Sequence, residues 1–248
     1  MELVGRNALV TGVSRPAGIG FAIARRLQQA GASVFVQGWA PHDVAQQYAD
    51  ADGTESVARQ LGVGHVEADF ADPDAPRRVV EAAREHLGAP LDVLVVNHAR
   101  GGGGPLADVT ADEIDAFLHE NVRASLLLVK EFAAQHDGGN GRIVLMTSGA
   151  HRGPMPSELA YAVSKGALHI ATATLADDLA GRGITVNCVN PGPTDTGWGL
   201  SDFDPSPRMP AGRWGEPDDA ARLVAWLCSD DARWVTGQTI DSEGGFRR

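Results

Sequence analysis

Tyr161 and Lys165 are the residues whose types and spacing point most directly to chemistry. Tyrosine and lysine each occur only twice, as Tyr48, Tyr161, Lys130 and Lys165, and arginine supplies nearly all of the positive charge. On a helix, residues four apart lie on one face about one turn apart, so the lysine ammonium can lie beside the phenol. A neighbouring positive charge lowers the pKa of a phenol from its usual value of about 10, which suits the phenol to general acid or base catalysis. A surface pair without function is the alternative interpretation.

A glycine-rich turn forms the second candidate site. The sequence T-G-V-S-R-P-A-G-I-G occupies positions 11–20, between a short apolar run and a helical pattern. Backbone N–H groups at such a strand-to-helix turn receive the pyrophosphate of a dinucleotide, and glycine lets the anion approach the backbone. The alternative is a turn whose glycines serve only tight packing. The residues expected to hold the dinucleotide here are Gly12, Ser14, Arg15, Gly18, Ile19 and Gly20.

The nature of the dinucleotide depends on the residues near its adenosine ribose. A carboxylate there accepts the 2′-hydroxyl of NAD and repels the 2′-phosphate of NADP. The second apolar run ends in Gln37, Gly38 and Trp39, without an acid, and Arg15 offers a guanidinium suited to a phosphate. The sequence therefore favours NADP(H) over NAD(H). A solvated loop arginine is the alternative role of Arg15.

Alternating apolar runs and helical patterns must position these residues. Such alternation predicts an α/β fold: a doubly wound parallel sheet of about seven strands with helices on both faces, and ligands beyond the carboxyl ends of the strands. No linker or repeat divides the 248 residues, so one domain covering 1–248 is expected. The predicted strands are 7–11, 33–37, 65–68, 92–97, 142–147, 185–190 and 238–241, and the predicted helices are 21–30, 54–61, 74–86, 110–135, 158–179 and 218–229.

Composition limits the partners. The 21 basic and 32 acidic side chains give a formal net charge of −11, which repels nucleic-acid phosphates and anionic lipid. No apolar run approaches the ~20 residues that span a bilayer, and no signal-like start opens the sequence, so a cytoplasmic protein is expected. Cys188 and Cys228 form no C-x-x-C, and the eight histidines contain no helical zinc pair, so no metal site is expected. His98 and His151 are interpreted as loop histidines that form hydrogen bonds.

Residues 193–216 are rich in proline, glycine and aspartate and are too long for a routine connection. We interpret them as a substrate lid and name them the lid segment. Its Trp198, Phe203 and Met209 could line an apolar pocket or pack against another subunit, and the sequence favours neither.

The sequence resembles the short-chain dehydrogenase/reductase family, especially its 3-oxoacyl-[acyl-carrier-protein]-reductase-like members. The resemblance covers essentially the whole chain, and its motifs are highly specific when taken together. It implies a single-domain Rossmann fold that binds NAD(P). The motifs are the glycine turn at 11–20, Asp69-Phe70, Asn97-His98-Ala99, Asn121-Val122, Ser148, Tyr161-x-x-x-Lys165, Pro191-Gly192 with Thr196, and V-T-G-Q-T-I-D-S-E-G-G at 235–245.

The resemblance also implies roles for individual residues. Tyr161 would exchange a proton with a carbonyl oxygen, and Ser148 would form a hydrogen bond with the same oxygen. Lys165 would lower the pKa of Tyr161 and bind the nicotinamide ribose, and Asn121 would anchor a water that links Lys165 to solvent. A helix-capping Ser148 and a helix-kinking Asn121 are the alternatives. The implied cofactor contacts are Asp69 and Phe70 on the adenine side, and Asn97, Ala99, Pro191, Gly192, Thr194 and Thr196 on the nicotinamide side.

Two departures from the family pattern affect these implications. Pro16 and Ala17 make the glycine turn two residues longer than usual, which leaves the placement of Ser14 and Arg15 open. The family's N-N-A-G reads N-H-A-R at 97–100, followed by four glycines, so we expect the wall beside the nicotinamide to be unusually open or mobile, which leaves the shape of the substrate undetermined.

The leading prediction is an NADP(H)-dependent oxidoreductase that reduces a ketone, for example a 3-oxoacyl group, to a secondary alcohol, or catalyses the reverse reaction. An NAD-dependent secondary alcohol dehydrogenase and a non-catalytic nucleotide-binding regulator are the alternatives. The resemblance implies a homo-oligomer, either a tetramer or a dimer. The identity of the small-molecule substrate stays open.

Overall fold

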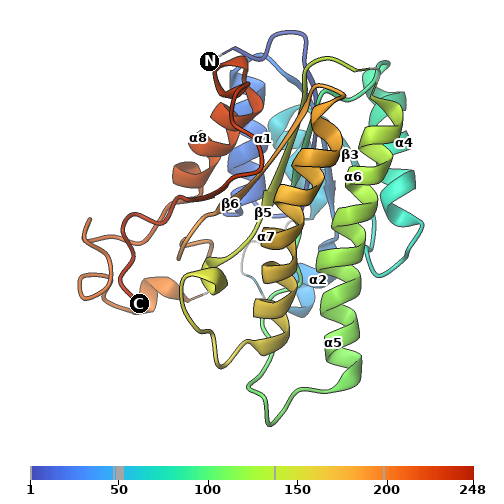
Figure 1. Cartoon of the computed structure of the whole chain (residues 1–248). Helices are drawn as coiled ribbons and strands as arrows, with labels where there is room; N and C mark the ends of the chain where they lie inside the picture. The colour runs from blue at the N-terminus through green and yellow to red at the C-terminus, as the bar shows by residue number, and fades with distance from the viewer. Residues whose placement is uncertain (1, 47, 49–52, 137, 198) are drawn as a thin grey trace.

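The fold is that of a computed structural model, which describes residues 2–46, 48, 53–136, 138–197 and 199–248. Within these residues the chain alternates between strands and helices, as Figure 1 shows. Trp198 of the lid segment lies outside the described residues.

A seven-stranded sheet forms the centre of the molecule. All neighbouring strands run parallel, in the order β3-β2-β1-β4-β5-β6-β7. All seven predicted strands are present, so the predicted doubly wound sheet is confirmed. The strands are β1 (Asn7–Thr11), β2 (Ser33–Gly38), β3 (Gly64–Glu67), β4 (Val93–Val96), β5 (Gly141–Met146), β6 (Ile184–Asn190) and β7 (Thr239–Asp241).

Helices cover both faces of this sheet. On one face α1 (Ile19–Gln29) packs against α8 (Pro217–Cys228), and on the other α4 (Ala75–Leu87) packs against α6 (Ala124–Gln135). The long helix α7 (Leu159–Ala180) lies beside α6 in Figure 1 and shares its apolar core. The shorter elements are α2 (Ala40–Ala45), α3 (Thr54–Leu61), α5 (Ala111–Phe117) and 3₁₀ turns at Gly149–His151, Leu200–Asp202 and Asp230–Ala232.

The strand sequences explain why the sheet is covered on both sides. In β4, Val93 and Val95 pack into the core under α1 and α8, whereas Leu94 and Val96 pack into the core under α4 and α6. Successive side chains of a strand point to opposite faces, so an unbroken apolar run needs a hydrophobic layer on each side.

The segment 110–135 differs from its prediction. It is not one regular helix: α5 and α6 are separated by a π-helical turn at Leu118–Arg123. Thr110 caps the start, where its hydroxyl accepts a hydrogen bond from the Glu113 N–H at 3.2 Å. The wider turn contains Asn121, and π-helical turns occur frequently at functional sites.

The order of the strands determines where a ligand can bind. The chain passes from β1 outward to β2 and β3 and then returns to β4, which pairs directly with β1 through Val10 and Val95. The crevice beyond the carboxyl ends of β1 and β4 is therefore the topological switch point, where α/β sheets bind ligands.

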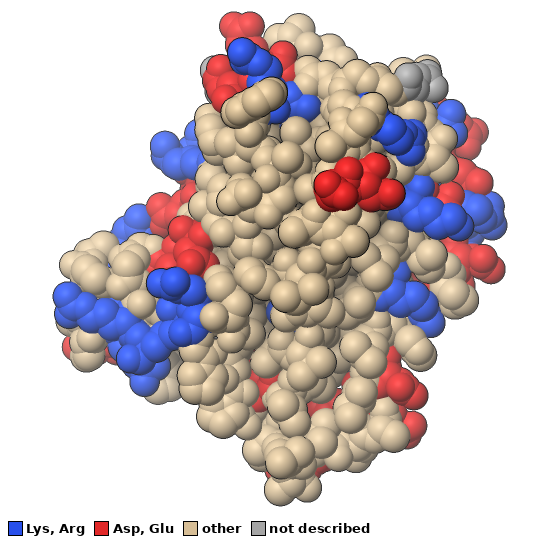
Figure 2. Space-filling view, viewed as in Figure 1, with Lys and Arg blue, Asp and Glu red and all other residues tan. Residues whose placement is uncertain are grey.

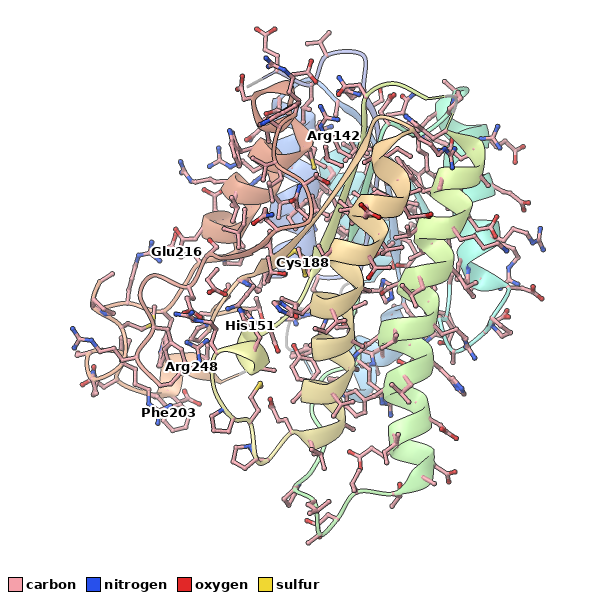
Figure 3. All side chains as sticks on the ribbon, viewed as in Figure 1. Arg142, His151, Cys188, Phe203, Glu216 and Arg248 are labelled. Atoms are coloured by element: carbon pink, nitrogen blue, oxygen red, sulfur yellow. The ribbon has the colours of Figure 1, made fainter. Side chains whose placement is uncertain are left out.

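The opposite end of the sheet holds a buried arginine. Arg142 is only 2% exposed at the start of β5, and its side chain donates to the Ser229 and Gly141 carbonyls at 3.4 and 2.9 Å. Arg142 and Arg6 both pair with Asp230, at 3.4 and 2.9 Å. Figure 3 places Arg142 at the end of the sheet away from His151 and Arg248.

Among the described residues, no helix is long and apolar enough to cross a membrane.

Candidate active site

A cleft of about 260 Å³ lies at the switch point, beyond the carboxyl ends of β1, β2 and β4. It contains most of the residues expected to hold the cofactor. Its lining residues are Gly12, Ser14, Arg15, Gly18, Ile19, Gln37, Trp39, His42, Asp43, Tyr48, Ala68, Asp69, Phe70, Asn97, His98, Ala99, Arg100, Glu120 and Thr196. The predicted residues outside this lining are Gly20, Asn121, Ser148, Tyr161, Lys165, Pro191, Gly192 and Thr194.

The glycine turn has no room for side chains at two of its glycines. Gly12 has a φ of +71°, and a Cβ built there would lie 2.7 Å from the backbone of His98. A Cβ at Gly20 would meet the Gly12 carbonyl and lie 2.7 Å from the Asn97 Nδ2. Gly12 therefore shapes the turn, and Gly20 lets α1 pack closely against it.

The first turn of α1 offers a site for an anion. Its N-cap is Gly18, which provides no capping side chain, and the first turn contains no acid. The N–H groups at such a helix start are available to a ligand, and the helix dipole favours negative charge there. Pro16 and Ala17 form a turn that the Gly18 N–H closes on the Arg15 carbonyl at 3.1 Å. The two extra residues therefore do not displace Gly18 and Gly20 from the start of α1.

Arg15 reaches across the cleft instead of extending into solvent. Only 8% of it is exposed, its guanidinium carbon lies 3.6 Å from the centre of the Tyr48 ring, and its Nη2 donates to the Thr196 carbonyl of the lid segment. This observation excludes the alternative of a freely solvated loop arginine. Arg15 and Thr196 both border the cleft, so a phosphate bound there would lie close to this guanidinium.

Asp43 places a carboxylate in the cleft that was not predicted from the sequence. It lies on α2, five residues beyond Gly38, yet it is only 7% exposed and lines the same cleft as Trp39 and Tyr48. As predicted, β2 ends without an acidic residue, but the following helix α2 places the Asp43 carboxylate in the wall of the cleft. Helix α2 was not predicted, so no sequence pattern indicated this placement.

Two amide side chains brace the glycine turn. The Nδ2 of Asn97 donates to the Thr11 and Gly12 carbonyls at 3.1 and 3.0 Å. The Oε1 of Gln37 accepts from the Gly12 N–H at 3.1 Å, and its Nε2 donates to the Ala68 carbonyl at 2.8 Å. Asn97 thus lines the cleft, but its amide holds the turn in place. Gln37 was not predicted as a site residue, although a polar residue in an otherwise apolar strand is a signal in the sequence.

His98 lines the cleft and links the loop after β4 to β1 and to the π-helical turn. Its Nε2–H donates to the Glu120 carbonyl at 3.0 Å, so its Nδ1 accepts from the Thr11 hydroxyl at 2.9 Å. Burial, together with the charge of Lys165, lowers the pKa of His98 to about 3, which keeps the ring neutral. Its ring packs against Phe70 at 4.2 Å between centroids. The interpretation as a hydrogen-bonding histidine therefore agrees with the geometry.

Asn121 lies in the π-helical turn and is fully buried. Its Oδ1 accepts from the Arg100 N–H at 2.7 Å, and its Nδ2 donates to the Arg100 carbonyl at 3.0 Å and to the Ser164 hydroxyl at 2.9 Å. Its own carbonyl accepts from the Ser125 hydroxyl at 2.6 Å. The side chain thus joins the loop after β4 to α7, directly beside Tyr161 and Lys165.

Lys165 points toward the end of β5. Its Nζ donates to the Met146 carbonyl at 2.9 Å, and its own carbonyl accepts from the Thr147 hydroxyl at 2.9 Å. Only 2% of the residue is exposed, and burial lowers its pKa to about 8. The nitrogen lies 5.9 Å from the centre of the Tyr161 ring.

The pKa of Tyr161 differs from its expected direction. The spacing from Lys165 predicted a lowered pKa, but burial raises the pKa of Tyr161 above its usual value, and the charge of Glu158 acts in the same direction. The physical reason is that the ammonium donates to the Met146 carbonyl and not to the phenol. The ring of Tyr161 packs edge-on against Phe117 at 6.4 Å between centroids.

Ser148 lies two residues beyond the end of β5 and has an extended backbone. Its Oγ accepts from the Ala150 N–H at 3.3 Å, so the serine caps the short 3₁₀ turn Gly149–His151. This turn packs against α7, which carries Tyr161. The capping alternative therefore agrees with the geometry, and the catalytic role of Ser148 stays a prediction.

The turn after β6 and the lid segment complete the site. The Thr194 hydroxyl donates to the Pro191 and Gly192 carbonyls, both at 3.2 Å, so its side chain stabilises the turn itself. The ends of the lid segment are paired, because the Asp195 N–H donates to the Gly215 carbonyl at 2.8 Å. In the lid segment, Met209 is buried whereas Phe203 is 68% exposed. Figure 3 shows Phe203 at the edge of the molecule.

Ser164 and Thr147 also belong to this site and were missed from the sequence. Ser164 lies between Tyr161 and Lys165, donates to the Tyr161 carbonyl at 2.8 Å and accepts from Asn121. Thr147 precedes Ser148 and binds the backbone of Lys165. Each lies next to a predicted catalytic residue, and this adjacency was the signal in the sequence that could have identified them.

Among the described residues, no three His, Cys, Asp or Glu side chains form a group that could hold a metal ion.

Comparisons with known proteins give consistent relatives. A family model described as enoyl-(acyl carrier protein) reductase matches residues 12–247. The chain is 41% identical to YjdA of Bacillus subtilis, described as an uncharacterized oxidoreductase, over 97% of this chain and 96% of that protein. Its structure is similar to a short-chain dehydrogenase from Burkholderia cenocepacia in complex with NADP, with a TM-score of 0.85, 39% identity and 99% of each chain covered. The landomycin C-6 ketoreductase LanV, with bound NADP and rabelomycin, matches with a TM-score of 0.85 and 36% identity, over 98% of this chain and 97% of that one.

Proposed function

This chain belongs to the short-chain dehydrogenase/reductase family and is an oxidoreductase that acts on CH–OH or C=O groups, and on that premise we propose that it is an NADP(H)-dependent carbonyl reductase. In this proposal Tyr161 is the acid/base for the interconversion of a ketone and a secondary alcohol. The substrate is a small molecule, and 3-oxoacyl groups are one class that the sequence resemblance implies.

One observation carries the proposal. Asn121, Ser148, Tyr161 and Lys165 come from three separate parts of the chain: the π-helical turn, the loop after β5, and α7. Buried hydrogen bonds support the proposal: Ser164 joins Asn121 to the Tyr161 carbonyl, and Lys165 bonds to the Met146 carbonyl and to the Thr147 hydroxyl, in the two residues before Ser148. A non-catalytic regulator would have no need for this complete set.

The residues of the chain perform the proton chemistry in this proposal. Bound NADPH supplies the hydride. Tyr161, whose raised pKa keeps it protonated at neutral pH, donates its proton to the carbonyl oxygen of the substrate. Ser148 donates a hydrogen bond to the same oxygen and stabilises its developing negative charge. Lys165 supplies positive charge beside the phenol, and its lowered pKa of about 8 makes it able to exchange a proton near neutrality.

The residues that line the cleft support a dinucleotide as its ligand. Gly12, Gly18 and Ile19 surround the start of α1, where a pyrophosphate would lie, and Arg15 would meet a 2′-phosphate. Asp69 and Phe70 border the same cleft, as expected for the adenine side, and Ala99 and Thr196 border it as expected for the nicotinamide side. Several similar structures contain NADP or NADPH, which supports the choice of NADP(H).

Asp43 favours the competing NAD-dependent function. Its carboxylate lines the adenosine end of the cleft and could accept the 2′-hydroxyl of NAD. Dissociation constants measured for NADPH and NADH on the same protein decide between the two cofactors. We expect NADPH to bind at least about tenfold more tightly, and tighter binding of NADH would reject this part of the proposal.

The catalytic assignment can be tested with a matched control, because the sequence contains only two lysines. Tyr161→Phe and Lys165→Met are expected to lower the rate of carbonyl reduction by about 10² to 10⁴, because each removes a group that acts in proton transfer. Lys130→Met, which changes the only other lysine, on the surface of α6, should retain the rate. The assay follows NADPH absorbance with a panel of ketones, and NADPH binding is measured separately by fluorescence. Full turnover by Tyr161→Phe would remove the tyrosine from the mechanism.

We further propose that the protein forms a homo-oligomer through α5 and α7. Ile114 and Val163 are 40% and 56% exposed and line one apolar depression, and Ile170 on α7 is 71% exposed. Figure 2 shows few charges over the central surface that α7 occupies in Figure 1. Exposed apolar patches of this kind mark protein interfaces. The role of the lid segment as a substrate cover and the cytoplasmic location stay predictions.

A further inference from the structure

The loop after Ser148 is held by a histidine that the proposed mechanism does not use. The Nδ1 of His151 lies 3.2 Å from the Ser148 carbonyl, and its Nε2 lies 3.2 Å from Asp241 Oδ1 at the end of β7. Figure 3 shows His151 on the short helix beside α7, close to Arg248 of the C-terminal segment. The catalytic loop is thus fastened to a strand at the edge of the sheet.

Asp241 extends this connection to the nicotinamide-side turn. Its Oδ1 also accepts from Asn190 Nδ2 at 2.9 Å, and the Oδ1 of Asn190 accepts from the Gly192 N–H at 3.0 Å. Asn190 is fully buried, so the amide has a fixed orientation. One carboxylate therefore joins Ser148, through His151, to the Pro191-Gly192 turn.

The groups around His151 support this arrangement. The ring of His169 on α7 stacks on it, with centroids 4.7 Å apart and an angle of 15° between planes. Arg152 approaches the other oxygen of Asp241 at 3.3 Å, but its side chain is 55% exposed. Arg248, paired with Glu243, fills the space beside Gly149 and Gly153. The imidazole is thus confined between α7, β7 and the C-terminal residues.

We propose that His151 and Asp241 are positioning residues that fix the backbone of Ser148 relative to the Pro191-Gly192 turn. This inference rests on the proposed carbonyl reduction, because it assigns the two residues to the catalytic serine of that reaction. The Ser148 carbonyl and the Asp241 carboxylate can only accept hydrogen bonds, so a neutral imidazole at His151 donates to one of them, and a protonated imidazole donates to both. Holding the backbone of Ser148 fixes the direction of its hydroxyl, and small displacements of a catalytic group are costly.

The test compares His151→Ala, His151→Gln and, as the matched control, Arg152→Ala. The alanine variant should lower kcat by about tenfold or more and change the KM for NADPH by less than about twofold, since the serine moves but the cofactor cleft does not. Glutamine carries two N–H donors on one nitrogen, so His151→Gln should restore most of the activity. Arg152→Ala removes the exposed cation from the same carboxylate and should retain kcat.

Hydrogen exchange of residues 148–155 in the cofactor-free protein gives a readout that does not depend on turnover. Exchange should be faster in His151→Ala than in the wild type and in Arg152→Ala. Unchanged exchange and kcat in His151→Ala, or an equal loss in Arg152→Ala, would overturn the inference. If the wild type reduced no carbonyl compound in the panel, the proposed function would fail, and the exchange rates alone would still decide whether His151 holds the loop.

Discussion

At the scale of single residues, the protonation of Tyr161 is the property with the clearest chemical consequence. Burial raises its pKa, and the nearest ammonium, that of Lys165, donates to the Met146 carbonyl. A phenol that stays protonated serves as the acid in carbonyl reduction. The reverse reaction needs the phenolate, so oxidation of an alcohol should require a higher pH than reduction.

The titration of Tyr161 can be measured directly because the chain has only two tyrosines. In the cofactor-free protein, we expect the absorbance change at 295 nm that Tyr161→Phe removes to occur above the usual tyrosine pKa of about 10. The unfolded chain releases this proton at lower pH than the folded chain, so the contribution of Tyr161 to stability is complete below pH 10 and is lost as the pH rises further. A removed component that titrates below 10 would contradict the structure.

The sequence reveals some of these residues better than others. Tyr161 and Lys165 are separated by one helical turn, and a helix preserves that relation, so their proximity was predictable. The Met146 carbonyl that binds Lys165, and Asp43 in the cleft wall, come from parts of the chain that only the tertiary fold brings near. The direction of the Tyr161 pKa therefore could not be derived from spacing alone.

At the scale of secondary-structure elements, the glycine turn depends on close contact between α1 and β1. We expect Gly20→Ala to destabilise the protein by about 1 to 3 kcal/mol, because the added methyl group would overlap the backbone of Gly12 and crowd Asn97. NADPH binding should weaken as well, since the same turn borders the cleft. Urea unfolding and fluorescence titration with NADPH measure the two effects.

Gly181 provides the matched control for that substitution. It ends α7 with an ordinary helical φ of −62°, and a Cβ there would meet nothing within 4 Å. Gly181→Ala should therefore leave NADPH binding unchanged and alter stability by less than about 1 kcal/mol. Equal effects of the two substitutions would show that contact at Gly20 is not the cause.

The elements themselves were largely predictable, with one informative exception. Runs such as Val93–Val96 are apolar on both faces, which identifies buried parallel strands without knowledge of the fold. The π-helical turn at Leu118–Arg123 was not predicted, because the periodicity of 110–135 fits a regular helix. The turn is associated with the tertiary bonds of Asn121 to Arg100 and Ser164, and local propensity contains no information about such partners.

At the scale of the whole molecule, the apolar surface of α7 predicts association. We expect the wild type to elute as a dimer or tetramer in size-exclusion chromatography with light scattering. Replacing Val163 and Ile170 together by glutamate should shift the population toward monomer, because both side chains are exposed on α7. Val4→Glu, at a residue that is 78% exposed but remote from α7 in sequence, should not. A monomeric wild type would refute the proposed interface.

The two ends of the sheet perform separate tasks. Arg142, Arg6 and Asp230 secure the end where the strands begin, and Figure 1 shows the N-terminus on that side, away from the lid segment. A linker, tag or resin attached through the N-terminus would therefore leave the cleft beyond the carboxyl ends of the strands facing the surrounding medium. The protein can be tethered to beads or an electrode in this orientation with small molecules still free to enter and leave.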